Sequence, residues 1–243
     1  IMAIAQRHDL VVVEDAAQGV FARYKDSWLG TIGHMGCYSF HETKNFSCGE
    51  GGALVVNAPQ FEQRAEILRQ KGTNRSQFLR GQVDKYTWVD VGSSYVPSDM
   101  LAAFLLGQLE QLETITAKRR EIYQRYESLL TPLVERGLLR LPIIPQHCVS
   151  NYHMFYLLAA DVAQRDALIA HLKARGILAV FHYVPLHSAP RGRALDAKRH
   201  ELPVTDATSA SLLRLPMYYD LTESDVVEVA RAIYDFYGVA APE

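Results

Sequence analysis

The sequence predicts an α/β protein, with a large, mostly parallel sheet in its N-terminal part and a smaller α+β domain at its C-terminal end. Short apolar runs alternate with longer stretches in which apolar residues recur at helical spacing, a pattern typical of strands connected by helices. Residues 137–150, which contain glycine and proline, interrupt this pattern, and it restarts beyond them. We therefore expect a large domain with a connecting helix over residues 1–137 and a small domain over residues 138–243.

Three short segments of the N-terminal part are predicted to form strands. Residues 10–13 are a continuous apolar run that fits a strand covered on both faces, and the run ends abruptly in two acidic residues, the second being Asp15. Residues 36–40 and 52–56 are two further strands, joined by a polar loop that contains Lys44. Since ligands bind at the carboxyl ends of parallel strands, Asp15 is where a binding carboxylate is expected.

Helical spacing predicts the remaining elements. The inward faces of three helices in the first part carry Phe61, Ala65 and Leu68, then Leu101, Leu105 and Leu109, then Ile122, Tyr126, Leu129 and Leu133. Gly72 closes the first helix, Ser98 caps the second, and the third spans about residues 116–136. The small domain is expected to contain, in order, a strand at 154–159, a helix at about 165–175, a strand at 177–183 and a helix that begins at Thr222.

The first residues resemble the interior of an amphipathic helix. Residues 1–8 have no N-cap before them, and they lack the basic start, long apolar stretch and cleavage site of a signal peptide. We therefore expect a preceding segment, without which the N-terminal part of the large-domain sheet is missing.

Composition is that of a soluble globular protein and argues against two classes of partner. Hydrophobic residues make up 49% and charged residues 21% of the 243 residues. A net charge of −2, without a Lys/Arg block, gives no basis for binding nucleic acid or an anionic membrane. No apolar run approaches the roughly 18 residues of a membrane span. Three widely spaced cysteines without a CxxC pair indicate reduced thiols in a cytoplasmic protein.

Lys44 is the residue with the most specific chemistry. It lies in a polar bend between two apolar runs, and a lysine amine can form an imine with an aldehyde cofactor. The carboxylate of Asp15 can hold a pyridine nitrogen protonated, and the hydroxyl of Ser39 can bind a phosphate. Each residue is common by itself, because a loop lysine is usually a solvated charge. Their order, acid first and lysine last, predicts a site for pyridoxal 5′-phosphate (PLP) with Lys44 as the catalytic residue.

Four separated motifs carry a family likeness: Val13–Gln18, Ser39–Asn45, Gly49–Gly52 and Phe181–His187. In sequence and order they resemble the DegT/DnrJ/EryC1/StrS sugar aminotransferases, which are fold-type-I PLP enzymes acting on nucleotide-linked keto-sugars. The resemblance covers nearly the whole chain. It implies the PLP-dependent transferase fold type I, with roughly the first third of the usual family chain absent, and a homodimer or higher homo-oligomer with active sites at the subunit interface.

The same resemblance implies a substrate class and roles for individual residues. Residues 71–78 and 81–88 indicate, within the family, a dTDP-linked keto-sugar as substrate, with an amino acid, expected to be L-glutamate, as the donor. Lys44 would bind the cofactor covalently and would also move the proton between substrate and cofactor carbons. Asp15 would pair with the pyridine nitrogen; capping of a helix is the alternative role of this side chain.

The remaining cofactor contacts implied by the resemblance are less specific. Gln18 would contact the cofactor ring or its 3′-oxygen, or it is simply a surface glutamine. Ser39 would bind the phosphate, or it is an ordinary hydroxyl at a strand end. Many family members reach the cofactor phosphate of the neighbouring subunit with an asparagine, and Ser94 stands at the corresponding position here.

Three residues of the C-terminal part complete the implied site. His182 and Tyr183 would line the substrate side of the active site, and this interpretation is preferred to a metal site formed with His187, for which no third ligand is evident. His153 would line the same cleft, with a buried structural histidine as the equal alternative. No metal is expected.

Two functions from different classes follow from these residues. The first is transfer of an amino group to C4 of a dTDP-4-keto-6-deoxyhexose. The second is a noncatalytic nucleotide-sugar or PLP-binding protein, or an inactive fragment. Lys44 favours the first, because a protein that only binds its ligand does not need an imine-forming lysine.

Overall fold

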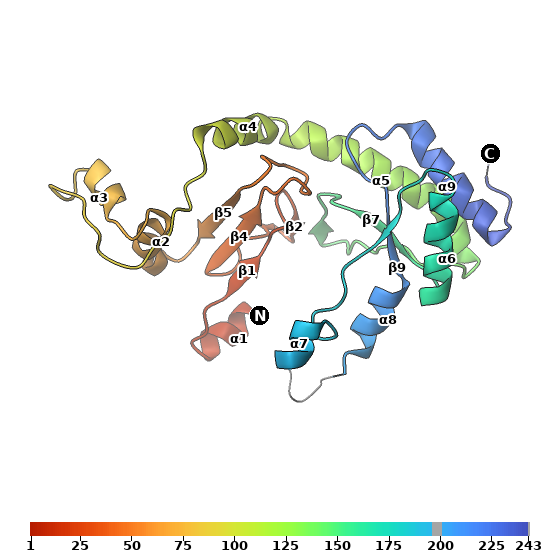
Figure 1. Cartoon of the computed structure of the whole chain (residues 1–243), viewed down its shortest axis with the longest axis horizontal. Helices are drawn as coiled ribbons and strands as arrows, with labels where there is room; N and C mark the ends of the chain where they lie inside the picture. The colour runs from red at the N-terminus through yellow and green to blue at the C-terminus, as the bar shows by residue number, and fades with distance from the viewer. Residues whose placement is uncertain (196–200, 243) are drawn as a thin grey trace. The chain divides into compact units, whose positions relative to one another are not determined.

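The computed structural model describes residues 1–195 and 201–242, and the chain divides into two compact units (Figure 1). The first unit consists of residues 1–114 and 145–151, and the second of residues 115–144 and 152–243. The long helix before residue 137 groups with the second unit, because its buried face contributes to the apolar core of that unit. The expected domain boundary after residue 137 concerns the domains of the whole protein and stays a prediction.

The first unit contains two small sheets. In chain order its elements are α1 (Met2–Arg7), β1 (Val13–Asp15), β2 (Arg23–Tyr24), β3 (Ser27–Trp28), β4 (Met35–Ser39), β5 (Gly52–Val56), the 3-10 helix η1 (Pro59–Phe61), α2 (Glu62–Arg69), α3 (Arg75–Leu79), α4 (Asp99–Leu109) and β6 (Cys148–Val149). One sheet has the order β1-β4-β5 and the other the order β3-β2-β6. Strand β1 runs parallel to β4, and β4 runs antiparallel to β5.

Strands β4 and β5 confirm the strands predicted at 36–40 and 52–56, but the predicted strand at 10–13 is wrong. Pairing with β4 begins at Val13, so the strand covers Val13–Asp15 instead. Leu10, Val11 and Val13 are 56%, 53% and 53% exposed, so the run is not covered on both faces in the described structure. The apolar run thus marks the approach to the strand, and the ladder itself includes the acidic residues.

The predicted helices of the first part are present. Helix α2 precedes Gly72, which has a left-handed backbone with φ of 74°. Helix α4 begins after Ser98, whose hydroxyl accepts a hydrogen bond from the Leu101 amide at 3.3 Å, as expected for an N-cap. Helix α5 (Leu112–Glu135) is the third predicted helix, and it begins about one turn earlier than expected.

The second unit surrounds a single apolar core. Besides α5, its elements are β7 (Phe155–Leu158), α6 (Val162–Lys173), β8 (Val180–Phe181), α7 (Pro190–Leu195), α8 (Pro203–Ser211), β9 (Leu212–Leu215) and α9 (Glu223–Tyr237). The sheet order is β7-β9-β8, with both pairs antiparallel. Tyr126, Phe155, Leu213 and Ile233 have no exposed surface and come from α5, β7, β9 and α9, which shows that all these elements contribute to one core.

Helix α9 begins after Thr222, as the sequence predicts. The Thr222 hydroxyl accepts a hydrogen bond from the Asp225 amide, and the Asp225 side chain accepts one from the Thr222 amide, which completes a capping box. Gly238, at φ of 64°, ends the helix in the left-handed region. No helix within the described ranges is both long and apolar enough to cross a membrane.

Candidate functional site

Two of the predicted site residues end neighbouring parallel strands. Asp15 is the last residue of β1 and Ser39 the last residue of β4, and the two strands are paired with Asp15 opposite Cys37 (Figure 1). Because parallel strands have their carboxyl ends at the same edge of a sheet, the Asp15 carboxylate and the Ser39 hydroxyl share that edge. This is the edge at which α/β sheets bind ligands.

Lys44 lies in the loop that leaves this edge between β4 and β5. The loop is closed by backbone hydrogen bonds, from the Phe40 amide to the Gly51 carbonyl at 2.8 Å and from the Cys48 amide to the Phe40 carbonyl at 3.0 Å. Phe46, 1% exposed, anchors the loop from within. The Lys44 amide donates to the His41 carbonyl at 2.9 Å, and the Lys44 side chain is half-buried. The buried ring of Phe46 therefore fixes the loop in which the half-buried Lys44 lies.

Asp15 does not cap a helix. Its Oδ1 accepts a hydrogen bond from the Ala17 amide at 3.1 Å, and the residues that follow form a turn. A carboxylate has about four acceptor positions, so this single bond leaves acceptor capacity at the sheet edge. Gln18, three residues later, lies exposed in the same turn.

Ser94 lies in a different part of the first unit. It forms an isolated antiparallel bridge with Gln70, in an exposed segment. A second isolated bridge nearby in the chain joins Thr73 and Trp88. Its proposed contact with the cofactor phosphate of another subunit stays a prediction.

The other predicted residues belong to the second unit. His182 follows β8, and its half-buried ring contacts the exposed ring of Tyr183 edge-on at 4.8 Å. Burial, and then the positive charge of Arg214, lower the pKa of His182 below its ordinary value of 6.5. Its buried Nδ1 has no hydrogen-bond partner among the described residues. His153 is half-buried, and its carbonyl accepts a hydrogen bond from the buried guanidinium of Arg119.

His187 contacts an aspartate, whereas the metal site considered above would require it to share a metal with His182. Its Nε2 lies 3.0 Å from Oδ1 of Asp206. No group of three or more potential metal ligands occurs in the part of the chain that the structure describes.

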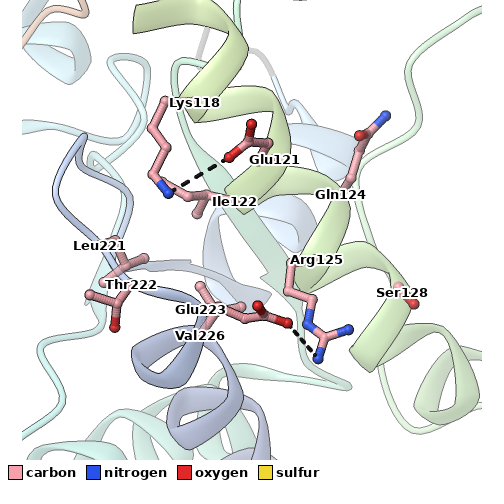
Figure 2. Close-up of a pocket in the computed structure, with 10 residues that line it drawn as sticks. All are labelled: Lys118, Glu121, Ile122, Gln124, Arg125, Ser128, Leu221, Thr222, Glu223 and Val226. Carbon is pink, nitrogen blue, oxygen red and sulfur yellow. Dashed lines mark ion pairs between the residues drawn. The ribbon is translucent and has the colours of Figure 1, made fainter.

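A groove of about 460 Å³ lies between α5 and the start of α9 (Figure 2). Its lining includes Lys118 and Arg125, and Figure 2 shows that each is paired with a carboxylate: Lys118 with Glu121 at 3.7 Å, and Arg125 with Glu223 at 3.0 Å. None of the predicted site residues, all of which are described, lines this groove.

Two polar residues that sequence analysis missed organise the first unit. The Glu14 carboxylate accepts hydrogen bonds from the amides of Gly30, Ile32 and Gly33 at 2.8, 2.6 and 2.6 Å, and thereby fixes the loop before β4. The side chain of Asn151, 6% exposed, donates to the carbonyls that flank Gly19. No local pattern identifies these roles, because both sets of partners lie more than ten residues away in the chain.

The residues at the sheet edge fit PLP as a ligand. The half-buried amine of Lys44 suits an aldehyde, the Asp15 carboxylate suits a protonated pyridine nitrogen, and the Ser39 hydroxyl suits a phosphate oxygen. All three come from β1, β4 and the loop that follows β4. These groups are of the chemical types that would hold such a ring by its nitrogen, its aldehyde and its phosphate.

Comparison with known proteins agrees with this chemistry. A model of the DegT/DnrJ/EryC1/StrS aminotransferase family matches residues 1–234. The "Pleiotropic regulatory protein" of Geobacillus stearothermophilus is 32% identical over 239 residues, which are 98% of this chain and 61% of that protein. The chain thus spans about three fifths of the length of this curated relative.

Solved structures share the fold. A DegT DnrJ EryC1 StrS aminotransferase from Brucella abortus superposes with a TM-score of 0.84 at 29% identity, over 98% of this chain and 60% of that one. DesV from S. venezuelae superposes with a TM-score of 0.83 at 30% identity, over 98% of this chain and 61% of that one. The fold is therefore that of the fold-type-I PLP-dependent aminotransferases.

Proposed function

Because the chain belongs to the DegT/DnrJ/EryC1/StrS aminotransferase family, whose aminotransferases use PLP, we propose that it carries the cofactor-binding centre of a sugar aminotransferase. The observation that carries this proposal is the placement of Asp15, Ser39 and Lys44 at the carboxyl edge of β1 and β4. A noncatalytic binding protein does not require an amine in this position.

Each side chain has a role that its chemistry explains. Bound PLP supplies an electron sink for the substrate carbon that bears the transferred nitrogen. The Lys44 Nζ would hold the cofactor through its aldehyde, and the same amine would be the group that moves a proton to and from that carbon. The Asp15 carboxylate holds the proton on the pyridine nitrogen, because a negative charge stabilises the protonated form. The Ser39 hydroxyl donates to the phosphate, and Gln18 contacts the ring.

The second unit supplies the proposed substrate side. His182 is kept neutral by burial and by Arg214, so its ring can accept or donate a hydrogen bond to a sugar hydroxyl without carrying charge. The exposed ring of Tyr183 offers a flat apolar surface, and His153 completes the set. Ser94 is proposed to reach the cofactor phosphate of a neighbouring subunit.

The specific reaction proposed is transfer of an amino group from L-glutamate to C4 of a dTDP-4-keto-6-deoxyhexose. Support comes from residues 71–78 and 81–88, which resemble the corresponding stretches of dTDP-4-amino-4,6-dideoxygalactose transaminase. The product would be used in surface polysaccharide synthesis similar to that of enterobacterial common antigen. We place the reaction in the cytoplasm, where the free thiols of Cys37, Cys48 and Cys148 would remain reduced.

We also propose a homodimer or higher homo-oligomer. The segment 74–88 mixes polar and aromatic residues, and its Tyr86 and Trp88 are 54% and 76% exposed. Exposed aromatic side chains of this kind are common at subunit interfaces. Light scattering that shows a fully active monomer of the full-length protein would contradict this assembly.

The function is tested by incubating the full-length protein with PLP, dTDP-4-keto-6-deoxyglucose and glutamate, followed by mass and NMR analysis of the sugar. We expect a 4-amino sugar and 2-oxoglutarate in equal amounts. A yellow preparation that borohydride bleaches would show an imine with a lysine independently of turnover, and loss of the colour in Lys44→Ala would assign it to Lys44. Binding of the nucleotide sugar without colour or product would instead support the noncatalytic alternative.

A further inference from the structure

Asn151 is a buried polar residue outside the motifs that predict the site. It ends the short segment 145–151, which returns to the first unit after helix α5. Its side chain is 6% exposed, so its polar atoms are shielded from water. A buried amide must satisfy its donors within the protein, and this one does so with backbone groups.

Asn151 joins two parts of the proposed site, one through its side-chain amide and the other through its backbone carbonyl. Its Nδ2 donates to the Gln18 carbonyl and to the Val20 carbonyl, both at 2.8 Å, which uses both hydrogens of the amide. These carbonyls belong to the turn that follows Asp15. On the other side, the Nδ2 of Asn45 donates to the Asn151 carbonyl at 2.7 Å.

Asn45 directly follows Lys44, so this second bond fixes the loop that carries the lysine amine. The partners are far apart in the chain, at 133 residues between Gln18 and Asn151 and 106 between Asn45 and Asn151. Strand pairing places the ends of β1 and β4 side by side but leaves the turn and the loop beyond them without a shared ladder. The Asn151 bonds supply that connection.

We propose that Asn151 is a positioning residue, which holds the turn after Asp15 and the Lys44 loop in fixed relation so that one cofactor can engage both. The inference rests on the proposed function only for the identity of the cofactor. Loss of the side chain leaves two carbonyls without their donor and frees the backbone to which Asn45 is bonded.

Asn57 provides a control with the same bonding pattern at a more exposed position. Its Nδ2 also donates to two carbonyls of the first unit, those of Gly30 and Gly33 at 3.1 and 3.0 Å. These carbonyls lie in the loop before β4, at the opposite end of that strand from Ser39 and Lys44. Asn57→Ala therefore removes the same kind of interaction from the same unit without touching the proposed site.

The experiment compares Asn151→Ala, Asn57→Ala and wild type in the full-length protein. In hydrogen–deuterium exchange without cofactor, we expect Asn151→Ala to raise exchange about tenfold in both segments 16–22 and 40–49. Asn57→Ala should raise it only in residues 28–36. The dissociation constant for PLP should rise about tenfold in Asn151→Ala and stay within about twofold in Asn57→Ala. Asn151→Ala should also shift the pH midpoint of the absorbance change of bound PLP.

Unchanged exchange in residues 40–49, or equal PLP affinity in the two variants, would overturn the proposal. If Asn151→Ala does not accumulate as folded protein, Asn45→Ala replaces it. That variant removes the bond to the Asn151 carbonyl, and the proposal requires it to raise exchange in residues 16–22 as well as in its own loop. A wild-type protein that binds no PLP would refute the proposed function, and the exchange comparison would still decide whether Asn151 links the two segments.

Discussion

The two units differ in what holds them together. The second unit has a continuous apolar core with many completely buried side chains, contributed by helices and strands alike. In the first unit, most buried apolar residues are alanines, and only Phe40 and Phe46 are large. Several of its large apolar side chains are at least half exposed: Leu10, Val11, Leu54, Trp88, Val91, Met100 and Phe104. The first unit therefore buries less of its apolar surface than the second.

In the first unit, hydrogen bonds from a few polar side chains, and not a large apolar core, hold the loops in position. Glu14, Asn57 and Asn151 each bind two or three backbone groups of distant loops. Such bonds are directional, whereas apolar packing is not, so they suit loops that must present side chains in fixed positions. The unit that carries the proposed chemistry is thus not the unit that carries the largest core.

The largest expected effect separates chemistry from stability in the first unit. Lys44→Ala should reduce transamination by the full-length protein at least about 10³-fold, because the covalent and proton-transfer roles proposed for Lys44 both need its amine. Its side chain is only half-buried, so the midpoint of urea unfolding should change little. Transamination at a normal rate would contradict the assignment of Lys44.

A pair of leucine substitutions tests the comparison directly. Leu213→Ala, at a fully buried position of the central strand β9, should lower the free energy of unfolding by about 2–5 kcal/mol. Leu54→Ala, at a 50% exposed position of β5, should lower it by less than about 1 kcal/mol. Urea unfolding of both variants measures the two values, and similar losses would show that Leu54 is covered in solution.

A smaller effect is expected at the start of α9. Thr222→Ala removes the hydroxyl half of the capping box and should lower the free energy of unfolding by about 1 kcal/mol. Ser98→Ala at α4 is its counterpart in the first unit, and the same measurement compares them. A much larger loss at α4 would show that the first unit depends on local helix stability more than the second does.

The smallest effect concerns pH. The pKa of His182 in the folded protein lies below its ordinary value of 6.5, so the unfolded state binds more protons as pH falls past that value. Stability contributed by the neutral ring is complete above 6.5 and is lost as pH falls through the folded pKa. Below pH 6.5, the free energy of unfolding of His182→Gln should therefore fall less steeply with decreasing pH than that of wild type. Identical slopes would show that the ring is solvated in both states.

Features that depend on residues close together in the sequence were predicted, and features that depend on distant residues were not. Strands β4 and β5, the cap at Ser98 and the start of a helix at Thr222 depend on neighbouring residues, and they were predicted correctly. Asp15 and Ser39 do end strands, whose ends are visible as abrupt changes in polarity, and the cofactor roles assigned to them and to Lys44 stay predictions. The predicted strand at 10–13 failed because its register is set by pairing with β4, which no local pattern encodes.

The parts that were missed depend on distant partners. Strand β9, at the centre of its sheet, was not among the predicted elements, because its four residues become a strand only between β7 and β8. Glu14 and Asn151 are ordinary polar residues until the fold brings backbone groups to them. To predict such contacts, one would have to know which segments more than ten residues apart in the chain lie together in the fold.

The return of residues 145–151 to the first unit also sets an order of events during synthesis. Asn45 leaves the ribosome 106 residues before Asn151, its hydrogen-bond partner. At about 5–20 residues per second, this separation corresponds to roughly 5–20 s in which the Lys44 loop exists without that bond. The Lys44 loop of the nascent first unit must therefore wait for the completion of helix α5 before this bond can form. A translational pause before residue 151 would prolong the period in which the loop lacks the bond.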